Sequence, residues 1–202
     1  MTSNEQPPDP RPALFSAIEK AGELLGKIDS THLSRPTPCD DFSVEDLGRH
    51  VVHVADRLNQ LGQGSAWDEL PQTDDTEAAD FSSVFAARSK EVVTTWSEPE
   101  AYAAIREVPW GAVPGAGCLV VYVPEFVTHS WDLAAAIGVD LNLDDEIVRA
   151  AFETSAFLPE DARGGPDAPF GPRVHVADDA PLLLQVAGAM GRDVTRWSGP
   201  IQ

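Results

Sequence analysis

The residues of this chain best suited to chemistry lie in one short stretch, where Glu125, His129 and Asp132 follow one another at intervals of four and three. On an α-helix, side chains three or four positions apart project from the same face. Almost every other residue from 126 to 137 is apolar or small, and a helix that is apolar nearly all round is a buried helix. An unpaired charge is costly inside a protein, so these polar side chains need an interior partner. The pattern predicts that this partner is a divalent metal.

A third ligand is available from an earlier segment. Apolar residues at steps of three and four from 44 to 61 predict a helix with one buried stripe. At about 100° per residue, His50 falls roughly 70° from the middle of that stripe and His53 roughly 130° from it. His50 therefore lies at the border of the buried face, whereas His53 is expected to face solvent or the wall of a cleft.

One glutamate and two histidines are a ligand set that binds Zn²⁺ in catalytic sites and leaves a fourth position for water or substrate. The sequence thus predicts a metal site made by His50, Glu125 and His129, with zinc preferred and nickel or iron also suited to these ligands. Asp132 shares the face of His129. It is expected to accept a hydrogen bond from a ligand imidazole or to orient a substrate, which makes it the candidate catalytic residue.

Two other interpretations fit the same residues. The first is a metal-binding module without catalysis, such as a sensor or a partner-binding bundle. The second is a helical structural protein in which a satisfied Glu–His pair holds no metal, because an interior histidine is more often structural than a ligand. The second interpretation requires His50 to lie away from Glu125 and His129. The distances among these three residues therefore distinguish it from the others.

The elements that position these residues are predicted to be mostly helical. Ser43 is a good N-cap for the helix that carries His50. Pro124 either occupies the first turn of the central helix or lies inside a longer helix that begins near Gly117, and Gly138 ends this helix. Further helices are expected over 14–28, from 81 to near 99, over 144–158 and over 180–190, with a polar connection over 62–80, a loop over 164–172 and a short strand over 173–176.

The composition narrows the function classes. The 202 residues carry a formal net charge of −19, which argues against nucleic acid or an anionic membrane as a partner, because both need a basic surface. No apolar run reaches membrane-spanning length, the N-terminus has no signal-peptide core, and two cysteines are too few for a disulfide framework. We therefore expect a cytoplasmic protein, either a monomer or a homodimer. It would consist of a disordered tail (1–10), a four-helix metal-binding bundle (11–140) and a C-terminal helical extension packed on the bundle (141–202).

Other residues with chemical potential have simpler explanations. Cys39 follows Thr37 and Pro38 and has only Arg35 near it in sequence to lower its pKa, so we expect a packing or turn role. Cys118 lies in an apolar run and is expected to be inert. Arg192 could hold an anionic substrate, but a salt bridge is favoured in so acidic a chain.

Several motifs resemble the actinobacterial DinB-like metal-binding proteins, the group related to mycothiol-dependent maleylpyruvate isomerases. They are Thr37-Pro38-Cys39, His50-Val51-Val52, His129-Ser130-Trp131-Asp132-Leu133-Ala134, Val176-Ala177-Asp178-Asp179-Ala180 and Gly191-Arg192-Asp193. The resemblance covers most of the chain from about residue 12. Phe42 departs from it, because tryptophan is usual at that position, as does Ser130, where glycine or threonine is common.

The resemblance implies a mainly α, DinB-like four-helix bundle with a small C-terminal extension. It also implies the metal ligands His50, Glu125 and His129, the three that helix geometry indicates. The resemblance further implies that the co-substrate is a low-molecular-weight thiol, mycothiol. The metal would hold this thiol as a thiolate, which would attack an electrophilic substrate. The resemblance therefore implies a metal- and thiol-dependent transferase or isomerase.

Overall fold

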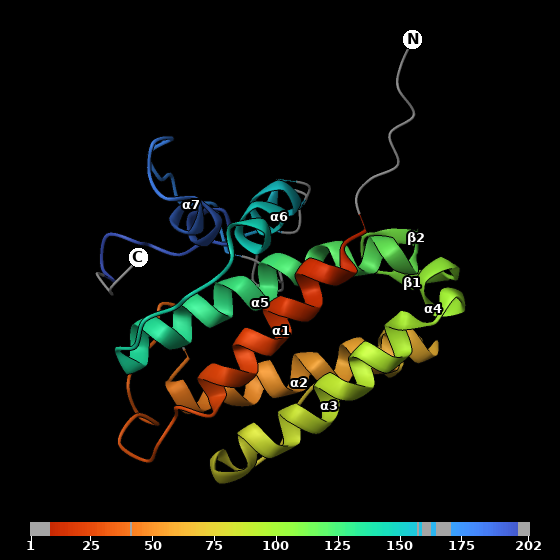
Figure 1. The fold of residues 1–202 in the computed structure, drawn as a ribbon, viewed down its shortest axis with the longest axis horizontal. Coiled ribbons are helices and arrows are strands. Elements are labelled where there is room, and N and C mark those ends of the chain that lie inside the picture. The colour runs from red at the N-terminus through yellow and green to blue at the C-terminus, as the bar shows by residue number, and fades with distance from the viewer. Residues whose placement is uncertain (1–8, 41, 157, 159–162, 165–170, 198–202) are drawn as a thin grey trace.

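Four long helices form the core of the protein. The computed structural model describes residues 9–40, 42–156, 158, 163–164 and 171–197. The four helices are α1 (Arg11–Leu25), α2 (Val44–Gln63), α3 (Phe81–Ser97) and α5 (Gly115–Ile137). Helices α1 and α2 each contact both α3 and α5, so the four surround one apolar core (Figure 1). The predicted four-helix bundle is therefore present.

Short elements close one end of the bundle. Helix α4 (Pro99–Ala103) leads into an antiparallel hairpin of β1 (Ile105–Val108) and β2 (Gly111–Pro114). Arg106 of this hairpin donates to the carbonyl oxygens of Leu61 (2.8 Å) and Gly62 (2.9 Å), which lie in the last turn of α2. The hairpin was not predicted, because its two four-residue strands are too short for a clear alternating pattern.

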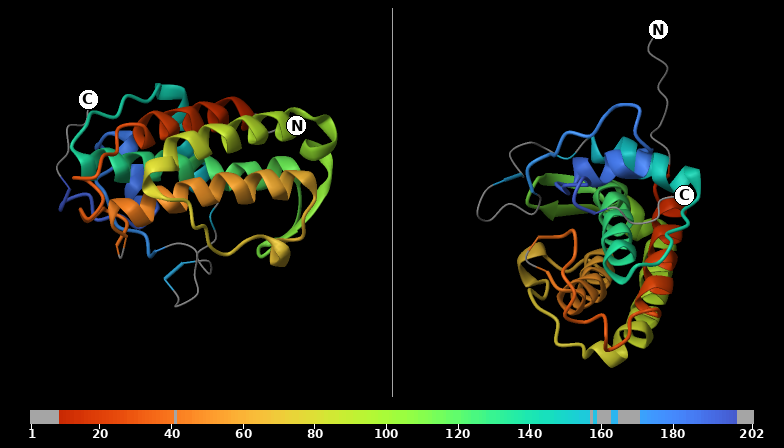
Figure 2. Two further views of the ribbon diagram at one scale, coloured as in Figure 1. Left: turned by 90° about the horizontal axis from the view of Figure 1, so that it is seen from below. Right: turned by 90° about the vertical axis from the view of Figure 1, so that its left-hand side faces the viewer.

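The C-terminal part of the chain packs on one side of the bundle. Helix α6 (Asp145–Ser155) contacts α5 and α1, and α7 (Leu182–Ala189) contacts α6 and α5, as the two views of Figure 2 also show. Helix α5 is thus covered by α1 and α2 on one side and by α6 and α7 on the other. This arrangement explains why its sequence is apolar nearly all round.

Both helices that carry the predicted ligands have identifiable boundaries. At the start of α2, the Ser43 hydroxyl accepts the Asp46 N–H (3.2 Å) and the Asp46 carboxylate accepts the Ser43 N–H (3.0 Å), a capping box. Helix α5 begins at Gly115, so Pro124 lies inside it and not in its first turn. Gly138, with φ of 75°, ends α5 in the left-handed conformation that glycine adopts without strain, as predicted.

Some predicted elements differ from the structure. The segment 173–176 is not a strand: no strand in the described part of the chain pairs with it, and Val174 donates instead to the carbonyl of Gly188 in α7 (2.9 Å). His175 is therefore exposed and does not lie in a sheet. Helix α1 begins and ends three residues earlier than predicted, and α6 and α7 are shorter at their ends. Two short 3₁₀ helices, Trp67–Glu69 and Ala78–Asp80, interrupt the polar connection, whereas most of the predicted 164–172 loop lies outside the described residues.

No helix in the described part of the chain is long and apolar enough to cross a membrane.

Candidate metal centre

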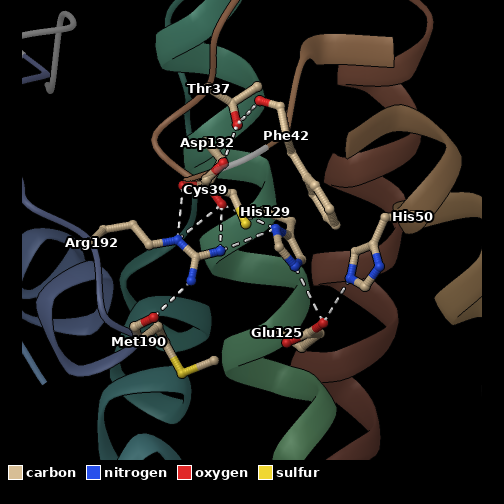
Figure 3. A network of polar contacts seen from close by, with 9 residues as sticks. All are labelled: Thr37, Cys39, Phe42, His50, Glu125, His129, Asp132, Met190 and Arg192. Atoms are coloured by element: carbon tan, nitrogen blue, oxygen red, sulfur yellow. Dashed lines mark hydrogen bonds and ion pairs between the residues drawn. The ribbon is translucent and has the colours of Figure 1, made fainter. Parts of the chain in front are cut away.

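Helices α2 and α5 bring the three predicted ligands together (Figure 3). Nε2 of His50 and Nε2 of His129 each lie 3.2 Å from the same oxygen, Oε1 of Glu125. One donor atom from each residue lies within 4.8 Å of the other two, and the imidazole rings meet edge to face with centroids 4.8 Å apart. The interpretation without a metal required His50 to lie away from the other two residues, and the structure does not have that arrangement.

The ionisation of His50 and Glu125 suits metal binding. Burial lowers the pKa of His50, which favours the neutral imidazole that a metal needs. Burial alone would raise the pKa of Glu125, but the charge of His129 and hydrogen bonds from both histidines hold it well below its usual value. Burial alone would lower the pKa of His129, but the charge of Glu125 and the hydrogen bonds to Asp132 and Glu125 raise it, so a metal would have to displace a proton from this imidazole. The side chains of His50 and Glu125 are 29% and 19% exposed, against 6% for His129. Solvent therefore reaches the cluster from the side of His50 and Glu125.

Asp132 lies behind His129. Its Oδ2 is 3.0 Å from Nδ1 of His129, and its side chain is fully buried. If Nδ1 carries the imidazole proton and donates it to Asp132, the Nε2 lone pair faces Glu125 and His50. A carboxylate in this position fixes the tautomer and orientation of a metal-ligating histidine. The geometry is the one expected of an acceptor for a ligand imidazole.

Arg192 pairs with Asp132 from the C-terminal part of the chain. Its Nη2 is 2.8 Å from Asp132 Oδ2, its Nε is 3.3 Å from Oδ1, and its Nη1 donates to the carbonyl of Met190 (2.7 Å). The preceding residue, Gly191, has φ of 90°, which turns the chain after α7 towards the site. Burial alone would raise the pKa of Asp132, but the charge of Arg192 and the bonds from His129 and Arg192 lower it. The favoured salt bridge of Arg192 is therefore present.

Two neighbours of the site were not predicted as such. The ring of Phe42 lies 5.5 Å from that of His50, centroid to centroid, and its side chain reaches the imidazoles of His50 and His129 in Figure 3. Cys39 has a donor atom within 4.8 Å of donors on His129 and Asp132. The sequence offered only Arg35 as a basic neighbour of this cysteine, whereas in the fold the charge of Arg192 acts on it. No local sequence signal identifies these contacts.

His53 was predicted to face solvent or a cleft wall and is instead buried, with 8% of its surface exposed. The polar connection over 64–80 lies across α2, and three arginines bind it there. Arg57 donates to the carbonyl of Pro71 (2.8 Å), Arg49 donates to the carbonyl of Thr76 (3.3 Å), and Arg88 forms an ion pair with Asp74. The Nδ1 atom of His53 has no hydrogen-bond partner among the described residues. Cys118 lies in the core, as expected.

Comparisons with known proteins agree on one family. The profile of the mycothiol maleylpyruvate isomerase N-terminal domain matches residues 14–134. Uncharacterized proteins from two strains of Mycobacterium tuberculosis are 28% identical over 186 residues, covering 92% of this chain and 99% of their own. The crystal structure of the mycothiol-dependent maleylpyruvate isomerase superposes with a TM-score of 0.55, and that of a histidine-to-alanine variant with 0.57. Each has 15% identity and covers 77% of this chain and 72% of the other. The predicted DinB-like fold is confirmed, and the chain belongs to the mycothiol maleylpyruvate isomerase N-terminal domain family.

Proposed function

We propose that this protein is a metal- and thiol-dependent transferase or isomerase. His50, Glu125 and His129 would hold the divalent metal, and mycothiol would be the thiol co-substrate. The observation that carries the proposal is the convergence of two imidazole nitrogens and one carboxylate oxygen within 4.8 Å of one another, from two packed helices. The family relationship supports a thiol as the partner of that site.

The donor set fits a metal with an open coordination position. Two neutral imidazoles and one carboxylate match catalytic zinc sites, and nickel or iron also suits these donors. All three ligands lie on long helices, which hold a site more rigidly than loops do. A divalent metal bound there would supply Lewis acidity that lowers the pKa of a thiol reaching it from the exposed side.

The residues of this chain have separate roles in the proposal. Glu125 contributes the negative charge, and His50 stays neutral because it is buried. Asp132 keeps the proton of His129 on Nδ1, and Arg192 keeps Asp132 ionised. The thiolate form of the co-substrate would attack an electrophilic carbon. Addition to an alkene followed by loss of the same thiol isomerises it, whereas displacement of a halide or opening of an epoxide gives a conjugate.

The test is thiol-dependent turnover by zinc-loaded protein. We expect loss of the electrophile, followed by NMR, when mycothiol is supplied with maleylpyruvate, an alkyl halide or an epoxide. We expect no loss when the thiol is omitted or when Glu125→Gln protein replaces the parent. If protein shown to contain metal consumes none of these electrophiles, the proposal of an enzyme is contradicted. A metal-binding sensor or a partner-binding bundle is then favoured.

Asp132→Asn is expected to weaken zinc binding by roughly 10- to 100-fold, the usual effect of losing the outer partner of a ligand. Asparagine keeps the shape of Asp132 but offers His129 no charged acceptor. Competition against a chromophoric chelator measures the change. Asp140→Asn, the same chemical change at an exposed position, serves as the control and should leave the affinity unchanged. Equal zinc affinity in the two variants would show that Asp132 does not support His129.

A further inference from the structure

A second set of metal-ligand atoms lies on the other side of the His129 ring. Cys39, His129 and Asp132 each place one donor atom within 4.8 Å of the other two. The nitrogen of His129 that faces Asp132 is Nδ1, whereas Nε2 faces Glu125. Figure 3 shows the sulfur of Cys39 beside His129, on the side of Asp132. His129 therefore belongs to two donor sets, one at each ring nitrogen.

The position of Cys39 is fixed by the connection between α1 and α2. Its carbonyl oxygen lies 3.0 Å from Oγ1 of Thr37 and accepts the N–H of Phe42 at 3.1 Å. Thr37 is itself buried, with 4% of its surface exposed, and its hydroxyl also lies 2.9 Å from the carbonyl of Phe42. These bonds hold the thiol against α5. The other two donors are nine-tenths or more buried, with His129 5% and Asp132 0% exposed.

A cationic group already lies among these donors. Nη2 of Arg192 is 2.8 Å from Oδ2 of Asp132 and 3.4 Å from Nδ1 of His129. Burial raises the pKa of the Cys39 thiol to about 12, although the charge of Arg192 acts in the opposite direction. Exchange of the guanidinium for a metal ion would leave the buried carboxylate of Asp132 paired with a positive charge, which is what a buried carboxylate needs.

We propose that Cys39, His129 and Asp132 form a second metal site, which takes thiophilic divalent ions and competes with the site of His50 and Glu125. One thiolate, one imidazole and one carboxylate select softer ions than two imidazoles and one carboxylate do. When an ion occupies the second site, Cys39 releases its proton to solvent, because a coordinated thiol is deprotonated, and Arg192 leaves the position that it holds beside Asp132.

Competition follows from the chemistry of imidazole. A neutral imidazole carries one proton, so it offers only one nitrogen to a metal at a time. Ligation through Nδ1 moves the proton of His129 to Nε2, from which it donates to Oε1 of Glu125 at the observed 3.2 Å. The first site then lacks one of its three ligands. The two sites are therefore alternatives, and the softness of the ion decides between them.

Cadmium alone, added to metal-free full-length protein, is the probe. We expect about one equivalent to bind, with an ultraviolet thiolate-to-cadmium charge-transfer band, since Cd²⁺ resembles Zn²⁺ but is softer. Cys39→Ser should abolish the band, whereas Cys118→Ser, which removes the other thiol, should retain it. Added to zinc-loaded protein, each bound cadmium should release one zinc, measured with a zinc-sensitive dye.

Three results would overturn the inference: no band in the parent, a band that survives Cys39→Ser, or cadmium binding with the band while zinc is fully retained. His50→Ala separates this inference from the proposed function. The variant should lose zinc yet keep the cadmium band, because His50 belongs only to the first site. If zinc binding requires His50 but no cadmium band depends on Cys39, the second site is refuted. The proposed function is unaffected by that result.

Discussion

Protein carrying His129→Ala is expected to contain almost no metal, whereas the parent retains about one equivalent of zinc, nickel or iron per chain. His129 has the most buried side chain of the three predicted ligands, and no other donor from α5 replaces its Nε2 in that cluster. The zinc affinity should fall by more than about 100-fold, because loss of an outer partner of a ligand alone costs roughly 10- to 100-fold. Elemental analysis of protein purified without a histidine tag measures the content.

His53→Ala is the matched control. It removes an imidazole that is also buried, 8% exposed, and lies one turn from His50 on α2. This variant should keep its metal, so a general effect of removing a buried histidine can be recognised. A parent that holds no metal even after incubation with zinc, or a His129→Ala protein that keeps it, would refute the ligand assignment. Family membership would then describe the fold alone.

The candidate ligands could be predicted because helical periodicity is a local property. Glu125 and His129 are one turn apart on a helix, and the apolar residues around them show that this helix is buried. The stripe on α2 likewise placed His50 at the border of its buried face, where the structure has it 29% exposed. Helical periodicity does not predict that α2 packs against α5, and this packing brings the three candidate ligands together.

The rest of the site depends on paths of the chain that no local pattern encodes. Asp132 and Arg192 are 60 residues apart and meet because the chain turns at Gly191 after α7. The apolar stripe on α2 predicted the face of the helix from which His53 projects. It did not predict that the acidic connection covers this face. Three arginines hold the connection there, and each bonds a group distant in sequence: Arg49, Arg57 and Arg88.

Arg192→Met is expected to destabilise the metal-free protein by about 3–5 kcal/mol near neutral pH, the usual cost of removing one partner of a buried ion pair. The side chains of Asp132 and Arg192 are 0% and 12% exposed, so solvent cannot replace the lost charge. His129 then faces two carboxylates, those of Glu125 and Asp132, without the guanidinium. Urea unfolding in the presence of a chelator measures the change in the free energy of unfolding.

The pH dependence of this loss distinguishes charge from packing. In the parent, the pKa of Asp132 is lowered on folding, so its contribution to stability is present above the unfolded value of about 3.9 and is lost as the pH falls through the folded value. Without Arg192, only His129 offsets the effect of burial, so the pKa of Asp132 is expected to rise relative to the parent. The variant is then penalised most at high pH, and the difference in stability between parent and variant should shrink as the pH falls.

A double variant, Asp132→Leu with Arg192→Met, completes the argument. Replacing a whole buried ion pair by apolar residues is often neutral or stabilising, whereas breaking it is costly. The double variant should therefore recover most of the stability that Arg192→Met loses, and its difference from the parent should not shrink with falling pH as the single variant's does. Equal losses in the single and double variants, independent of pH, would mean that Arg192 stabilises the C-terminal part of the chain by packing. In that case, the charge of Arg192 would not be what holds Asp132 ionised behind His129.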